Sequence, residues 1–180
     1  QDLGFPALFG GQVMGQALSA AQETIDKSRN VHSLHSYFLR PGDAKKSVVY
    51  EVENIRDGKS FSTRRIKAIQ NGKAIFYMTA SFQTPEQGFD HQEIMPEVSS
   101  PENIPSYSDF IKANQEHIPP SIREIYLAEK PIEIRPVDPY NWLKPEKMPA
   151  KCNMWIKANG TLSDDLRIHT YMLAYTSDFH

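Results

Sequence analysis

Two hairpin signals constrain the fold of this chain more than any other feature of its sequence. Asp57-Gly58 separates residues 47–55 from residues 61–70, and Asn71-Gly72 separates the latter from residues 73–83. Asp-Gly and Asn-Gly are preferred in hairpin loops because a type I′ turn needs a positive φ at both central residues. The flanking segments are rich in β-branched and aromatic residues, which favour strands. The sequence therefore predicts three consecutive antiparallel strands.

The last of these strands has an apolar face with a strict period of two. That face comprises Ala74, Phe76, Met78, Ala80 and Phe82. The opposite face carries mostly polar side chains, so we expect one side of the sheet to cover a core.

A helix and one more strand precede the hairpins. Apolar residues at near-helical spacing predict a helix over residues 9–25, and residues 31–39 are predicted to form a strand. Gly11 and Gly15 lie on neighbouring turns of the helix, and each costs about 1 kcal/mol of helix propensity relative to alanine. We expect close packing of the helix in a curved sheet to offset this cost. One helix followed by four antiparallel strands is an α+β unit.

The second half of the chain indicates the start of another such unit. Prolines are frequent in residues 85–130, which predicts a linker with a short helix at residues 107–117. Residues 131–137 and 152–160 are predicted strands, and residues 166–175 a second helix. We therefore expect three parts, residues 1–84, 85–130 and 131–180.

The two ends of the sequence suggest a longer polypeptide. The second helix is followed by no strand that would cover its apolar face, and Gln1 is not an initiator residue. We expect the chain to be truncated at both ends.

Composition excludes several classes of partner. The formal net charge of the 180 residues is −2, so nothing predicts binding to nucleic acid. No apolar run approaches the roughly 20 residues that span a bilayer. Cys152 is the only cysteine, which excludes an internal disulfide and fits a reducing compartment such as the cytoplasm.

The motif search predicts neither a cofactor nor a metal. The sequence lacks G-x-S-x-G, G-x-x-x-x-G-K-[ST] and G-x-G-x-x-G, so a serine nucleophile elbow and a nucleotide cradle are not indicated. His32 and His35 are three residues apart, so in a regular strand they face opposite sides and cannot hold one metal ion. A buried structural role is the simpler interpretation of both.

Five segments, in order along the chain, resemble the acyl-CoA thioesterase II family. They are FGGQVMGQAL (9–18), VHSLHSYFLRPGD (31–43), RDGKSFSTRRIKAIQNGKAIFYMTASFQ (56–83), RPV (135–137) and LAYTSDF (173–179). The resemblance implies a double hot-dog fold, in which each of two units wraps an antiparallel sheet around a long helix. It also implies hydrolysis of fatty acyl-CoA to a fatty acid and CoA, without a cofactor, by a homo-oligomeric protein.

In that family an Asp, a Thr or Ser, and a Gln together orient the attacking water. The resemblance places the catalytic Asp on Asp178 and the other two beyond His180. Gly10, Gly11 and His32 are further candidates for substrate binding, although packing explains the glycines more simply. The cations Arg64, Arg65, Lys67, Lys45 and Lys46 could meet the phosphates of CoA, but scattered surface charges explain them equally well, and they assign no CoA site.

Two other functions stay open. A non-catalytic module that binds acyl-CoA and has a regulatory role would lack the partners of Asp178. A hydratase or dehydratase acting on an acyl thioester would pair a His with an Asp, and His180 stands two residues after Asp178.

Overall fold

The computed structural model describes residues 7–138, 141 and 144–179, and its contacts divide the chain into two compact units. The first comprises the described parts of residues 1–89 and 162–180, and the second comprises residues 90–161 with the same restriction. The boundaries 1–84, 85–130 and 131–180 follow another criterion, the sequence pattern, and stay a prediction.

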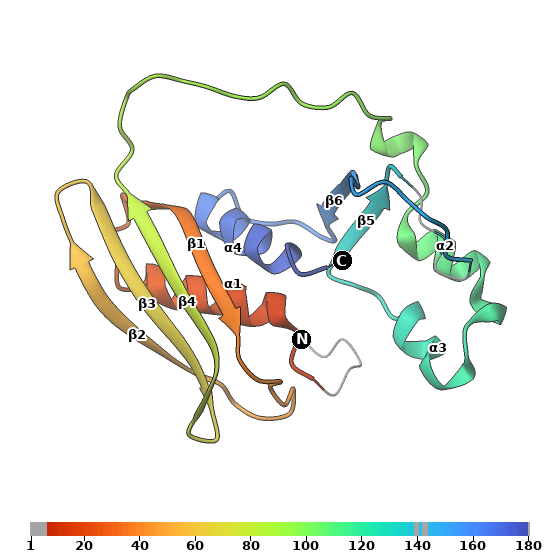
Figure 1. The fold of residues 1–180 in the computed structure, drawn as a ribbon, viewed down its shortest axis with the longest axis horizontal. Helices are drawn as coiled ribbons and strands as arrows, with labels where there is room; N and C mark the ends of the chain where they lie inside the picture. The colour runs from red at the N-terminus through yellow and green to blue at the C-terminus, as the bar shows by residue number, and fades with distance from the viewer. Residues whose placement is uncertain (1–6, 139–140, 142–143, 180) are drawn as a thin grey trace. The chain divides into compact units, whose positions relative to one another are not determined.

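The first unit has a four-stranded antiparallel sheet with two helices (Figure 1). Its elements are α1 (Gly10–Gln22), β1 (Asn30–Phe38), β2 (Val49–Asp57), β3 (Phe61–Gln70), β4 (Lys73–Gln83) and α4 (Leu166–Thr176). The strand order is β1-β4-β3-β2, with α1 across one face of the sheet and α4 beside α1. All six elements were predicted, with ends within three residues of those observed.

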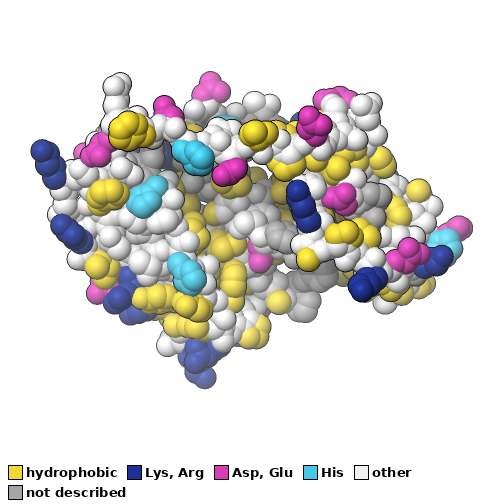
Figure 2. All heavy atoms as spheres, turned by 45° about the horizontal axis from the view of Figure 1, so that its top comes forward, with side chains coloured by type: hydrophobic (Ala, Val, Ile, Leu, Met, Phe, Trp, Pro, Cys, Tyr) yellow, Lys and Arg dark blue, Asp and Glu magenta, His cyan; other side chains and the backbone are white. Residues whose placement is uncertain are grey.

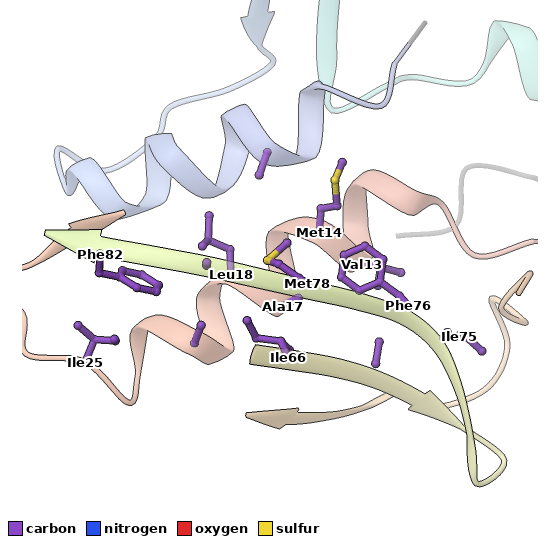
Figure 3. Close-up of a cluster of buried hydrophobic side chains, with 14 residues drawn as sticks. Val13, Met14, Ala17, Leu18, Ile25, Ile66, Ile75, Phe76, Met78 and Phe82 are labelled. Atoms are coloured by element: carbon purple, nitrogen blue, oxygen red, sulfur yellow. The ribbon is translucent and has the colours of Figure 1, made fainter. Parts of the chain in front are cut away.

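The core of this unit lies between α1 and the sheet (Figure 3). The predicted apolar face of β4 is confirmed over most of its length, because Phe76, Met78, Ala80 and Phe82 are each at most 1% exposed, whereas Ala74 at its start is only partly buried. These side chains pack on one stripe of α1, which includes Val13, Ala17 and Leu18. Burying a large apolar side chain stabilises a fold by about 1.5–3 kcal/mol, so this contact dominates the stability of the unit.

The two hairpins differ from each other. Asn71 and Gly72 have φ values of 51° and 72°, which confirms the predicted positive-φ turn between β3 and β4. Gly58 does not have a positive φ, so the type I′ prediction for Asp57-Gly58 was wrong. Three residues, 58–60, separate β2 from β3, and the Gly58 N–H donates to the Phe61 carbonyl at 2.8 Å. A loop of three residues does not require a glycine with a positive φ at position 58.

A β-bulge in β1 overturns the expectation for its histidines. The pairing of β1 with β4 shifts between Val31 and Ser33, which adds His32 as an extra residue and resets the alternation of faces. His32 bonds to the Ser81 hydroxyl at 2.8 Å, and His35 pairs with Thr79 in the register. Both histidines therefore lie on the face of the sheet away from α1, and both are exposed rather than buried.

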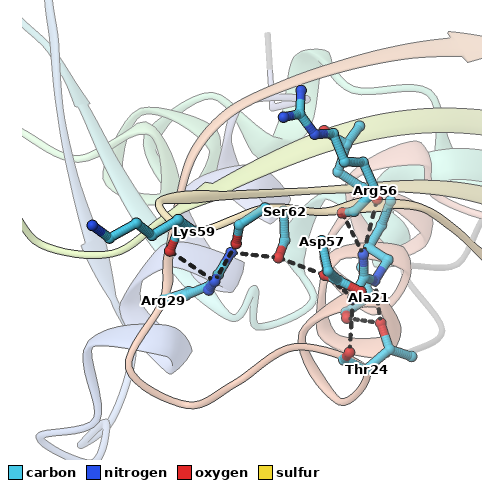
Figure 4. A network of polar contacts seen from close by, with 10 residues as sticks. Ala21, Thr24, Arg29, Arg56, Asp57, Lys59 and Ser62 are labelled. Carbon is cyan, nitrogen blue, oxygen red and sulfur yellow. Dashed lines mark hydrogen bonds and ion pairs between the residues drawn. The ribbon is translucent and has the colours of Figure 1, made fainter.

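Arg64 is 1% exposed, where a scattered surface cation was expected, and it bonds within the polar network that includes Thr24 and Asp57 (Figure 4). Its guanidinium donates to the Thr24 hydroxyl and carbonyl at 2.8 and 3.0 Å, and to the Arg56 carbonyl at 3.1 Å. A fourth bond reaches the Asp57 carboxylate at 2.8 Å. The hydrogen bond from Ser62, followed by that from Arg64, lowers the pKa of Asp57. The network ties the end of α1 to the loop between β2 and β3.

The second unit contains short elements only. They are α2 (Tyr107–Ala113), α3 (Pro120–Leu127), β5 (Ile132–Pro136), β6 (Met154–Ala158) and 3-10 turns at Pro101–Asn103 and Gln115–His117. Helix α2 begins with a capping box, in which Ser106 and Asp109 bond to each other's backbone N–H groups. Both segments were predicted to be strands, and in the structure β5 and β6 form an antiparallel pair.

The surface in Figure 2 shows basic and acidic side chains interspersed over the visible face. Among the described residues, no helix is both long and apolar enough to cross a membrane.

Candidate active site

Asp178 lies just beyond the end of α4 and contacts the first turn of α1. Its Oδ2 atom accepts a hydrogen bond from the Gly11 N–H at 2.9 Å, across 167 residues of sequence. The first N–H groups of a helix have no partner inside the helix and carry its positive dipole end. Phe9, the N-cap residue of α1, offers no side-chain hydrogen bond, and the first turn holds no acidic residue. Asp178 supplies both the missing acceptor and the negative charge.

The glycines of α1 make this approach possible. A Cβ atom on Gly10 would lie 2.7 Å from Asp178 Oδ2 and 2.6 Å from the Phe38 ring. A Cβ on Gly11 would lie 2.2 Å from the Tyr175 carbonyl oxygen, and one on Gly15 3.2 Å from that of Tyr171. Gly11 and Gly15 therefore face the backbone of α4. The expectation that they pack α1 into its sheet was wrong, because the sheet lies against a different stripe of the helix.

Three aromatic rings hold the end of α4 against the start of α1. Phe9 lies 5.2 Å from Tyr175 and 4.5 Å from Phe179 between ring centroids. Tyr175 and Phe179 are 5.3 Å apart. Aromatic pairs at these separations contribute about 0.5–1.5 kcal/mol each beyond the area that they bury. Asp178 is thus fixed between two anchored residues.

The partly buried carboxylate of Asp178 opens on a pocket of about 400 Å³ within the first unit. The lining residues are Leu8, Gly10, Val13, Phe38, Leu39, Arg40, Pro41, Gly42, Ile75, Phe76 and Asp178. Two of them, Arg40 and Asp178, are charged, and the others are apolar residues or glycines. Apolar walls of this kind suit a carbon chain, and the two charged side chains can contact the polar groups of a ligand.

The hydroxyl groups next to Asp178 serve their own helix. Thr176 donates to the Leu173 carbonyl at 3.0 Å, and Ser177 donates to the Ala174 carbonyl at 2.8 Å. No hydrogen bond to Asp178 other than that from Gly11 is found among the described residues. The second carboxylate oxygen, Oδ1, is therefore available to a water molecule.

The structure brings three of the four candidate residues together. Asp178, Gly10 and Gly11 meet at the start of α1, whereas His32 bonds to Ser81 on the outer face of the sheet and does not line the pocket. His180 lies outside the described residues. Within the described part of the chain, no group of three His, Cys, Asp or Glu residues is arranged to hold a metal ion.

Phe38 and Arg40 line the pocket, although neither was among the residues predicted from the sequence to bind substrate. Arg40-Pro41-Gly42-Asp43 consists of residue types that favour a turn after a strand, and Arg40, Pro41 and Gly42 form part of the pocket wall. The sequence did contain a signal for this role, because the segment directly follows a strand that neighbours β4. Loops at one end of a sheet lie close together and can line one pocket.

Comparisons with known proteins point to the same family along most of the chain. A family model described as acyl-CoA thioesterase N-terminal domain matches residues 2–83, and one described as acyl-CoA thioesterase matches residues 121–180. Acyl-CoA thioesterase 2 of Haemophilus influenzae is 43% identical over 180 residues, which are 100% of this chain and 63% of that protein. The chain thus spans less than two thirds of the length of this curated relative.

Solved structures show the same architecture. The crystal structure of the acyl-CoA thioesterase II TesB2 from Mycobacterium marinum is 37% identical, with a TM-score of 0.72 over 95% of this chain and 59% of that one. A protein with a hot-dog fold from Alicyclobacillus acidocaldarius is 17% identical, with a TM-score of 0.68 over 96% of this chain and 62% of that one, which is a likeness of fold alone. The predicted α+β hot-dog fold is confirmed, and its second unit is present in part.

Proposed function

Because this chain belongs to the acyl-CoA thioesterase family, we propose that the full-length protein hydrolyses fatty acyl-CoA to a free fatty acid and CoA. The observation that carries the proposal is the Asp178 carboxylate, held by the Gly11 N–H at one edge of a mostly apolar pocket. The pocket accepts the acyl chain, and the carboxylate meets the thioester end of the substrate.

Asp178 acts on the attacking water. Oδ2 is occupied by the Gly11 N–H, so Oδ1 accepts the proton as the water oxygen attacks the thioester carbonyl carbon. Collapse of the tetrahedral intermediate breaks the C–S bond, and the proton on Asp178 passes to the departing CoA thiolate. General-base assistance of this kind contributes about 10²- to 10⁴-fold in rate.

Gly10 and Gly11 serve the site because they have no side chain that would keep Asp178 and the end of α4 away from α1. The Gly11 N–H bonds to Asp178, so Gly11 orients the carboxylate and does not bind the acyl carbonyl. Gly10 lets Asp178 Oδ2 and the Phe38 ring come close to the start of α1, since a Cβ at this position would clash with both. The Thr or Ser and the Gln that the family resemblance implies complete the site from residues beyond His180.

The two alternatives have no specific support. Nothing in the described residues favours a binding module without turnover over an enzyme. The hydratase alternative depends on His180, of which nothing is described. We also infer a cytoplasmic homo-oligomer that acts in fatty acid metabolism, which light scattering and cell fractionation of the full-length protein would test.

The test is hydrolysis of medium- and long-chain acyl-CoA by the full-length protein in water enriched in ¹⁸O. We expect stoichiometric thiol release and one ¹⁸O atom in the fatty acid, because water is the nucleophile. On an enoyl-CoA substrate a hydratase would add water to the double bond without releasing thiol, and a binding module would bind acyl-CoA without either change. Both of these results contradict the proposal.

A further inference from the structure

The pocket holds a second charge that the hydrolytic mechanism does not use. Arg40 follows β1, is exposed to solvent and lines the same pocket as Asp178. Its guanidinium makes one described hydrogen bond, from Nη1 to the Ala74 carbonyl oxygen at 2.6 Å. Among the described residues no carboxylate pairs with it. The remaining donors of the guanidinium fork are thus free to bind an anion.

The segment that carries Arg40 is held firmly. The Leu39 and Arg40 N–H groups both donate to the Ile75 carbonyl, at 2.9 and 3.1 Å. Gln70, which is 6% exposed, accepts from the Asp43 N–H at 2.8 Å and donates to the Asp43 carbonyl at 3.0 Å. Such anchoring lowers the entropy that a flexible arginine loses when it binds a ligand.

The nearby charges favour an anion over a cation. Lys45 and Lys46 follow in the same loop, and both are exposed. Asp43 is the acidic side chain within this loop, and it pairs with Lys46 at 3.6 Å. Lys45 therefore adds a positive charge that no described carboxylate of the loop offsets.

We propose that Arg40 binds a phosphate group of the CoA moiety at the open end of the pocket. The inference rests on the proposed function, since a CoA thioester carries its phosphates on the leaving group. The apolar walls formed by Val13, Phe38 and Phe76 suit the acyl chain, whereas phosphates must stay hydrated or paired. A ligand with an apolar tail in the pocket would place its charged head beside the exposed guanidinium of Arg40. Arginine suits this task because its planar fork matches phosphate oxygens.

The test compares substrates with and without phosphates, using the full-length protein. Arg40→Ala, Arg40→Lys and wild type are assayed on one acyl group attached to CoA, to 4′-phosphopantetheine and to pantetheine. We expect Arg40→Ala to raise KM for acyl-CoA by roughly tenfold, from the loss of a charged hydrogen bond, with kcat within about twofold. KM for acyl-pantetheine should not change, and Arg40→Lys should restore part of the loss. The 4′-phosphopantetheine substrate shows whether the phosphate nearest the thioester is the one bound.

Arg65→Ala is the matched control, because Arg65 is a partly exposed arginine outside the pocket lining that pairs with Glu53 at 3.4 Å on the face of the sheet away from α1. An equal rise of KM for acyl-CoA and acyl-pantetheine, or no rise for either, would overturn the phosphate assignment. An effect confined to acyl groups with a terminal carboxylate would overturn it as well, since Arg40 would then bind the acyl end. If Arg40→Ala does not fold, Arg40→Lys and Arg40→Gln carry the same comparison. Absence of wild-type hydrolysis on all three substrates would instead contradict the proposed function.

Discussion

Replacing Gly11 by alanine tests the contact between α1 and α4 most sharply. The new Cβ would lie 2.2 Å from the Tyr175 carbonyl oxygen and 2.6 Å from the Phe9 ring. A backbone oxygen cannot move alone, so α4 must shift away from α1 and Asp178 must shift with it. The substitution therefore changes both the stability of the unit and the position of the Asp178 carboxylate through one displacement.

The magnitude follows from three contributions. Overpacking a well-filled contact costs about 1–3 kcal/mol, and a lost hydrogen bond to a charged group costs about 1.5–3 kcal/mol. Alanine in place of glycine stabilises the helix by about 1 kcal/mol through its higher helix propensity. We expect Gly11→Ala to lower the free energy of unfolding by about 1.5–5 kcal/mol, and thiol release to fall in the variant at temperatures where it remains folded.

Urea unfolding of the full-length protein, followed by circular dichroism, measures this change. Gly15→Ala and Gly88→Ala form a graded control series. A Cβ on Gly15 would lie 3.2 Å from the nearest carbonyl oxygen, whereas one on Gly88 meets nothing within 4 Å. We expect Gly15→Ala to change stability by less than about 1 kcal/mol, because propensity offsets the tight contact, and Gly88→Ala by less than about 0.5 kcal/mol. Equal stability of the Gly11 and Gly15 variants would refute the close contact between Gly11 and the backbone of α4.

Three further predictions concern the first unit. Arg64→Ala should cost about 3 kcal/mol in urea unfolding, because it leaves a cavity where a 1% exposed side chain stood and removes its hydrogen bonds to Thr24, Arg56 and Asp57, whereas Arg65→Ala on the outer face of the sheet should change stability by less than about 0.5 kcal/mol. Phe82→Ala should cost about 3–5 kcal/mol, since Phe82 is 0% exposed in the core; a cost below about 1 kcal/mol would contradict this packing. The hydrogen bonds from Arg167 lower the pKa of Asp165 to about 2, so the stability that this pair contributes should be complete above about pH 4 and lost as the pH falls towards 2. Asp165→Asn should flatten the dependence of the urea midpoint on pH in that window, and an unchanged slope would count against the pair.

The fold of the first unit was predictable because its signals are local. Alternating apolar residues in β4, the turn at Asn71-Gly72 and the helical spacing in α1 each act over a few residues. The errors arose where a single residue changed the geometry. The bulge at His32 moved that side chain to the other face of the sheet, and no composition rule marks the residue at which a strand bulges.

The candidate site was predictable only in part because it joins distant segments. The family resemblance selected Asp178, but its hydrogen bond to Gly11 spans 167 residues. Gly11 and Gly15 were recognised as a close-packing surface, yet the sequence does not say which element they meet. The free charge of Arg40 depends on which carboxylates lie within reach, and only a three-dimensional structure shows that.

The central claim is that Asp178 removes a proton from the attacking water, and Asp178→Asn tests it most directly. The amide oxygen of asparagine can still accept the Gly11 N–H, so the contact with α1 is kept while the base is lost. We predict that kcat for thiol release by the full-length protein falls by about 10²- to 10⁴-fold, with the urea midpoint nearly unchanged. Asp164→Asn, which alters an exposed carboxylate before α4, should leave kcat within about twofold. Turnover by Asp178→Asn within a few-fold of wild type would contradict the account.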